Sequence, residues 1–186
     1  RAASDRGKRS DTRIQIVIGN PPYNNKYKMS KASLDGGDRN LIYHPDPNNV
    51  ADPKRTLLDD FKDAVDDPKL RQRQKDLVNP YVFFWRWAIW KVAEQVPTER
   101  GIVSFIAPSA FIRGDSFLGA RAYLRKLFDE IWVIDLGGGV YGAVKEENVF
   151  SIGTPVAIVM AVRRPTLDSG AKNSDDLRSQ APARVF

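Results

Sequence analysis

The chain has 186 residues, of which 42% are hydrophobic and 10% aromatic, so it is long enough to bury the core of one domain. It contains no cysteine and one histidine, His44, which excludes disulfides, thiolate zinc sites and cysteine nucleophiles and leaves one imidazole for any metal or Ser-His-Asp site. The net charge of +6 and the pI near 9.6 favour a polyanionic partner without requiring one.

The N-terminal part of the chain combines a polar segment, a strand and a stiff loop. Residues 1–13 are polar and basic and have no apolar cluster, so we expect a linker or a disordered lead-in. Ile14 to Ile18 is almost continuously apolar, which predicts a strand buried on both faces. Gly-Asn-Pro-Pro-Tyr, from Gly19 to Tyr23, then predicts a rigid loop, because consecutive prolines fix φ and donate no backbone hydrogen bonds.

The middle of the chain predicts a long loop and two helices. Residues 24–52 are rich in Asn, Asp, Gly and Pro and show no periodicity. Residues 54–66 predict a short helix with one apolar face, and residues 76–96 predict a longer one that Pro97 ends. The apolar face of the longer helix consists of Val78, Tyr81, Trp85, Ile89 and Val92.

The second half alternates between strands and a helix. Residues 101–108, 131–136 and 154–162 predict strands, and residues 117–128 predict an amphipathic helix. This alternation predicts the α/β class, with mostly parallel strands flanked by helices. Residues 164–186 lack a core pattern and are expected to form a linker toward a region that the chain does not include.

The loop after the first strand carries the chemistry. In open α/β sheets ligands bind beyond the carboxyl ends of the strands, where this loop is expected. Asn20 offers a side-chain oxygen and Pro21 a backbone carbonyl, and two such acceptors can receive both hydrogens of an amino group. Tyr23 offers a flat face for stacking. The loop therefore suits a planar molecule that carries an exocyclic amino group.

The same residues resemble a known family. Gly19 to Tyr23 resembles the catalytic motif of the N6-adenine DNA methyltransferases. Later segments resemble, in the family's order, the methyltransferase part of large single-chain restriction-modification enzymes, including those with a helicase-like motor; they are residues 79–88, 101–112, 120–138 and 147–163. The resemblance implies that residues 14–163 form the C-terminal, catalytic-loop part of an incomplete Rossmann-like methyltransferase sheet.

The resemblance also implies a reaction and its residues. S-adenosylmethionine would be the cofactor, and the substrate would be an adenine flipped out of double-stranded DNA. Asn20, Pro21, Pro22 and Tyr23 would form the catalytic loop, and Phe150 would help to hold the flipped base. In this family the cofactor loop precedes Asn-Pro-Pro-Tyr, whereas only thirteen residues precede Ile14. We therefore expect this chain to be inactive alone and leave its cofactor-binding residues unassigned.

The missing functions are expected elsewhere in the same polypeptide: a cofactor-binding half, a possible motor and a target-recognition region. Leu136 to Gly139 is expected to be a glycine-rich turn rather than a cofactor cradle. No acidic residues have the spacing of a calcium or nuclease site, so no metal site is expected.

Two other functions remain open at this stage. One is methylation of a protein glutamine or an RNA base, since Asn-Pro-Pro-Tyr also serves those substrates. The other is a truncated, non-catalytic nucleic-acid-binding module. No apolar run approaches the roughly 20 residues of a membrane span, and no signal peptide is evident. We expect no membrane partner and a cytoplasmic location, whereas the DNA recognition sequence and the oligomeric state stay open.

Overall fold

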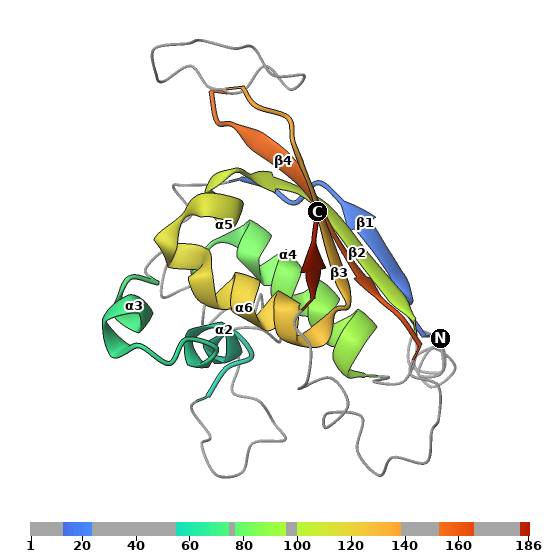
Figure 1. Cartoon of the computed structure of the whole chain (residues 1–186), viewed down its shortest axis with the longest axis horizontal. Helices are drawn as coiled ribbons and strands as arrows, with labels where there is room; N and C mark the ends of the chain where they lie inside the picture. The colour runs from blue at the N-terminus through green and yellow to red at the C-terminus, as the bar shows by residue number, and fades with distance from the viewer. Residues whose placement is uncertain (1–12, 24–54, 75–76, 96–99, 139–152, 166–182) are drawn as a thin grey trace, which may run out of the picture.

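The computed structural model describes residues 13–23, 55–74, 77–95, 100–138, 153–165 and 183–186. Within these ranges a layer of helices packs against one face of a five-stranded sheet (Figure 1). The predicted α/β class is confirmed.

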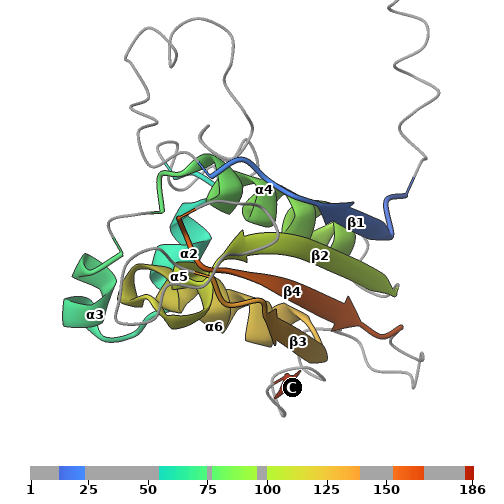
Figure 2. The same ribbon diagram turned by 90° about the horizontal axis from the view of Figure 1, so that it is seen from above.

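The sheet has the strand order β1-β2-β4-β3-β5, which Figure 2 shows from above. Its strands are β1 (Ile16–Gly19), β2 (Gly101–Pro108), β3 (Glu130–Asp135), β4 (Val156–Arg163) and β5 (Arg184–Val185). β1 runs parallel to β2, and β5 runs parallel to β3. β4 lies between β2 and β3 and is antiparallel to both.

The prediction of a mostly parallel sheet is therefore only partly correct, since the β1–β2 and β3–β5 pairs are parallel and the two longest pairings are antiparallel. β4 begins beside the end of β3, with Ala157 opposite Asp135, so it enters the sheet from the end at which β3 leaves it. A strand that enters from the end at which the previous strand left must run in the opposite direction. A pattern of apolar runs does not show on which side a connection returns.

The helical elements are α2 (Asp59–Asp63), α3 (Pro68–Gln72), α4 (Pro80–Ile89) with the π-helical turn η1 (Trp90–Glu94), α5 (Ala110–Arg113), the 3-10 turn η2 (Asp115–Phe117) and α6 (Leu118–Leu127). Three of them, α2, α4 with η1 and α6, lie within the predicted segments, whereas α3, α5 and η2 were not predicted. α4 starts later than predicted because Asn79 caps it, accepting from the amide of Tyr81 at 3.4 Å, and Pro80 occupies its first turn. Val78 thus lies before the helix and is exposed, not on its apolar face.

The core lies between the helices and the sheet face that they cover. Val103 and Phe105 of β2, Val159 of β4, and Trp85 and Ile89 of α4 all belong to this core, and all five side chains are buried. α6 approaches α2 so closely that a Cβ at Gly119 would lie 1.7 Å from the carbonyl oxygen of Phe61. Only glycine permits this approach.

The opposite sheet face is open in the described part of the chain, and in Figure 1 no labelled helix lies on that side. Three rows of residues cross it: Ile16, Ile102, Val162 and Glu130; Ile18, Ser104, Met160 and Trp132; Ile106, Ile158 and Ile134. The prediction that β1 is buried on both faces is wrong, since Ile16 is 58% and Ile18 75% exposed.

The last described residues, 183–186, add to the far edge of the sheet. β5 pairs with β3, and the Phe186 ring stacks on Trp132 at a centroid distance of 4.3 Å. Residues 1–12 of the predicted lead-in (1–13), the long loop (24–52) and most of the predicted C-terminal linker (166–182) lie outside the described residues. No helix in the described ranges is long and apolar enough to cross a membrane.

Candidate functional site

The Asn-Pro-Pro-Tyr loop follows β1 directly, at the edge of the sheet where the parallel strands β1 and β2 both end. Pro21 is buried, while Asn20 and Pro22 are exposed. The Tyr23 hydroxyl donates a hydrogen bond to Asn20 Oδ1. The loop thus anchors itself through a buried proline and presents the Asn20 side chain to solvent.

The Tyr23 ring packs between the loop and the helix layer. It is half-buried and meets the Tyr81 ring nearly edge-on, with centroids 6.4 Å apart and an interplanar angle of 77°. Partial burial raises the pKa of Tyr23 above its ordinary value, because the phenolate would be poorly solvated. Tyr23 therefore stays neutral near pH 7 and can donate its hydroxyl hydrogen.

A group of aromatic side chains joins the loop to the core. Tyr81 lies 6.3 Å from Phe111, and Phe111 stacks on Trp85 at 5.0 Å with an interplanar angle of 8°. Trp85 meets Phe105 edge-on, also at 5.0 Å. Phe105 pairs across the sheet with Gly19, where a Cβ would lie 3.2 Å from its ring. The contacts thus run from Tyr23 through the core and back to the residue before Asn20.

Sequence reasoning identified the loop but missed the residues behind it. Tyr81 was expected only as part of an apolar helix face, and Phe111 was not singled out. The available signal was position, since Tyr81 opens a helix and Phe111 follows the end of β2. Residues that begin or follow elements at one edge of a sheet lie near the ligand site. Phe150, the predicted second base contact, lies outside the described residues.

The glycine-rich segment after β3 is described only as far as Gly138. Gly137 and Gly138 have φ of 61° and 80°, a region that favours glycine. The amide of Val156 donates to the Gly137 carbonyl at 3.2 Å, which ties this segment to β4. The rest of the predicted glycine-rich turn, at residue 139, lies outside the described residues. No group of metal-ligating side chains occurs within the described ranges.

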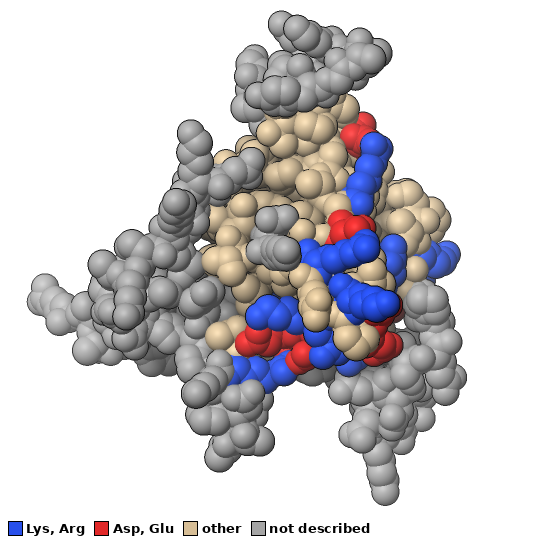
Figure 3. Space-filling model, turned by 90° about the vertical axis from the view of Figure 1, so that its left-hand side faces the viewer, with Lys and Arg blue, Asp and Glu red and all other residues tan. Residues whose placement is uncertain are grey.

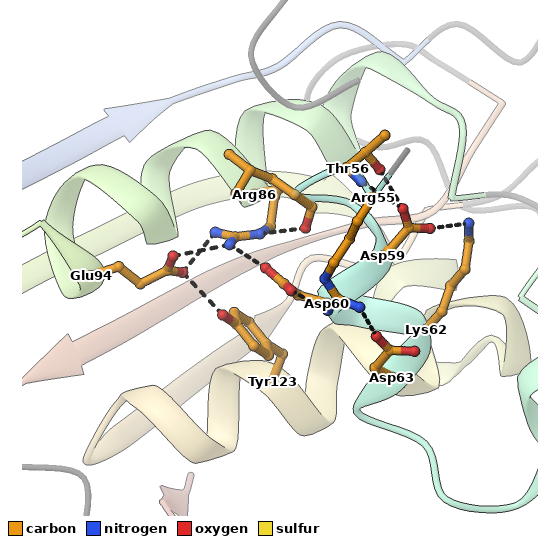
Figure 4. A network of polar contacts seen from close by, with 10 residues as sticks. Arg55, Thr56, Asp59, Asp60, Lys62, Asp63, Arg86, Glu94 and Tyr123 are labelled. Carbon is orange, nitrogen blue, oxygen red and sulfur yellow. Dashed lines mark hydrogen bonds and ion pairs between the residues drawn. The ribbon is translucent and has the colours of Figure 1, made fainter. Parts of the chain in front are cut away.

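A buried arginine stabilises the far end of α4 (Figure 4). The Arg86 side chain is only 1% exposed and donates to Glu94 at 2.6 and 2.9 Å, to Asp60 at 2.5 Å and to the Leu57 carbonyl at 2.7 Å. The Tyr123 hydroxyl donates to Glu94 at 3.3 Å. The network ties α2, α4, η1 and α6 together.

Arg86 stays charged despite its burial. Burial alone would lower its pKa, but the negative charge and hydrogen bonds of Glu94 and the charge of Asp60 outweigh that effect, and the pKa is raised. The network lies on the helix side and shares no hydrogen bond with the Asn-Pro-Pro-Tyr loop among the described contacts, so its role is structural. The sequence did hold a signal, an arginine inside the apolar run from Tyr81 to Trp90.

The surface over α3, α5 and α6 mixes both signs of charge (Figure 3). Several exposed arginines there are paired with acids. Arg73 lies 3.0 Å from Asp115, and Arg113 forms an ion pair with Asp135. The net positive charge of the chain is therefore not gathered into one uninterrupted basic patch on this face.

Comparison with solved structures gives regions of larger DNA-bound proteins as neighbours. The fold is similar to part of the "ATP-dependent Type ISP restriction-modification enzyme LlaBIII bound to DNA", with a TM-score of 0.60 and 26% identity over 88% of this chain. It is also similar to part of the protein in the "DrdV-DNA complex", with a TM-score of 0.57 and 27% identity over 86% of this chain. No family model and no curated protein matches the sequence.

A third neighbour supports the fold alone. It is a nuclease-deletion mutant of the Type ISP restriction-modification enzyme LlaGI in complex with a DNA substrate mimic, with a TM-score of 0.56 and 20% identity over 89% of this chain. The chain covers 10%, 14% and 15% of the three solved chains. It therefore resembles one region within each of these much larger polypeptides.

Proposed function

We propose that residues 14–163 are the catalytic-loop part of a DNA adenine N6-methyltransferase within a restriction-modification polypeptide. The observation that carries this proposal is the position of Asn20 to Tyr23, directly after β1 in a fold similar to a region of restriction-modification enzymes. An exposed amide oxygen and a half-buried aromatic ring at this place suit a base with an exocyclic amino group.

Each loop residue has a physical role in the proposed reaction. Asn20 Oδ1 has two lone pairs, so it can accept from the adenine amino group as well as from the Tyr23 hydroxyl. With the Pro21 carbonyl it would hold both amino hydrogens and orient the nitrogen lone pair toward the methyl donor. Pro21 and Pro22 keep these acceptors still because their φ angles are fixed. Stacking on Tyr23 would offset part of the cost of flipping the base.

In the proposed reaction S-adenosylmethionine would supply an electrophilic methyl group, and it would bind outside the Asn20 to Tyr23 loop. Phe150 stays a proposed second contact of the flipped base.

We also propose that the rest of the same polypeptide covers the open sheet face. Apart from Glu130, whose ion pairs lie at its edge, the face is uncharged and carries eight aliphatic or Met side chains, Ser104 and Trp132. DNA phosphates require cations, so this face suits an apolar layer of helices and not nucleic acid. In the solved neighbours 85% or more of each chain lies outside the region similar to this one, 15% being the largest share covered.

The test is methyl transfer by the full-length gene product that contains this chain. Asn20→Ala should abolish incorporation of labelled methyl groups into adenine of duplex DNA while DNA binding persists, because phosphate contacts dominate affinity. Lys62→Ala, on the exposed side of α2, is the control and should retain activity. Normal turnover of Asn20→Ala would overturn the proposal, and transfer to protein glutamine or RNA instead would support the alternative substrates.

A further inference from the structure

We propose that Tyr81 is a positioning residue, which holds the Tyr23 ring at the angle needed to stack on a flipped base. This inference rests on the proposed function, since it concerns the same loop. Tyr81 itself would not contact the base, because its side chain is only 3% exposed.

Tyr81 is well suited to act as a rigid support. It lies in the first turn of α4, where the Asn79 cap and Pro80 fix the backbone. Its ring is held from behind by Phe111 at 6.3 Å and by Phe117 at 5.7 Å. A ring fixed on these sides cannot follow Tyr23 if Tyr23 moves, so the position of Tyr81 defines the position of Tyr23.

Two side-chain contacts of Tyr23 with other described residues differ in how a base would affect them. The first is the hydrogen bond to Asn20 Oδ1, the same oxygen that would accept from the adenine amino group. The second is the edge-on contact with Tyr81, which a base at the exposed Asn20 side would not displace. When the base shares Asn20, the Tyr81 contact becomes the main constraint on the ring.

The size of the effect follows from edge-to-face aromatic contacts. Their strength beyond simple area burial corresponds to a change of roughly two- to tenfold in an equilibrium constant. Loss of the Tyr81 ring should therefore weaken stacking of the base by about that factor, whereas loss of its hydroxyl alone should not.

The experiment compares three variants of the full-length gene product: Tyr81→Leu, Tyr81→Phe and, as a matched control, Phe128→Leu. Phe128 is also a buried aromatic residue of the core and lies at the C-terminal end of α6, whereas the rings packed around Tyr81 include Tyr23, Phe111 and Phe117. With 2-aminopurine at the target adenine, Tyr81→Leu should increase the fluorescence of the complex and lower kcat/KM roughly two- to tenfold. Tyr81→Phe and Phe128→Leu should behave as wild type in both measurements.

Equal fluorescence and equal kcat/KM for Tyr81→Leu and Phe128→Leu would overturn the positioning role while leaving the proposed function intact. A readout that needs no methyl transfer separates the two ideas. In protein labelled with 3-fluorotyrosine, the ¹⁹F resonance absent from Tyr23→Phe identifies Tyr23. That resonance should shift or broaden in Tyr81→Leu and not in Phe128→Leu. An unchanged resonance would exclude the proposed support, whether or not the protein methylates DNA.

Discussion

The two faces of the sheet are made from similar residues but have different surroundings. On β3, Ile131 points toward the helices and is 6% exposed, whereas Ile134 points to the open side and is 56% exposed. Glu130 is the one charged residue among those named on the open face, and it lies at the edge near β5, where it forms an ion pair with Arg184. The comparison teaches that residue type alone does not decide burial here, because a helix layer must be present to bury a face.

The largest loss of stability should come from removing the buried charge of Arg86, which lies on the helix-covered side of the sheet. In the 186-residue chain, Arg86→Met should lower the free energy of unfolding by about 3–5 kcal/mol, because it leaves Asp60 and Glu94 without their buried partner. The control Arg73→Met, which removes a largely exposed ion pair with Asp115, should cost at most about 1 kcal/mol. Urea unfolding measures both values, and equal losses would contradict a structural role for the network.

The two isoleucines of β3 test the comparison directly. Ile131→Ala should lower the free energy of unfolding of the 186-residue chain by about 2–5 kcal/mol, since it opens a cavity in the core. Ile134→Ala should change it by less than about 0.5 kcal/mol, since that side chain loses few contacts. Urea unfolding measures both values. Equal losses of stability for the two variants would contradict the difference between the two sheet faces.

Thiol labelling shows whether the open face is covered in a longer polypeptide. In the full-length gene product, Ile18→Cys should react with a thiol reagent roughly tenfold more slowly than the exposed control Arg73→Cys. The two cysteines should react at similar rates once the protein is denatured. Rapid native labelling at position 18 would mean that no other part of the polypeptide covers this face.

The smallest expected effect concerns Glu130 and depends on pH. A hydrogen bond from Trp132, the charge and hydrogen bond of Arg164 and a hydrogen bond from Arg184 lower its pKa in the folded protein. A carboxylate with a lowered folded pKa stabilises the protein above its unfolded pKa of about 4.3 and loses that contribution as the pH falls through the folded value. The difference in urea midpoint between wild type and Glu130→Gln should therefore shrink between pH 7 and pH 3. A constant difference would exclude the ion pairs as its cause.

The sequence by itself determined the elements and the candidate loop. Gly101–Pro108 was predicted with the bounds that the structure has, because the run is apolar and ends at a proline. The loop at Asn20 to Tyr23 was predicted to follow a strand at the ligand-binding edge, and the described residues place it directly after β1. Both inferences depend on local chemistry, which a short stretch of sequence contains. The roles of Asn20 and Tyr23 stay predictions, as does that of Phe150.

Only the tertiary structure decided which groups face each other. The antiparallel insertion of β4, the pairing of Arg86 with Asp60 and the contact of Tyr23 with Tyr81 all join segments that are far apart in sequence. The exposure of one side of β1 likewise depends on which segments pack there. An apolar run reports that a residue can be buried, but its burial depends on whether another element packs there. The sequence likewise shows that an arginine carries a charge but does not show which acidic residue pairs with it. Such contacts are set by the path of the whole chain, because packing is a property of neighbours in space.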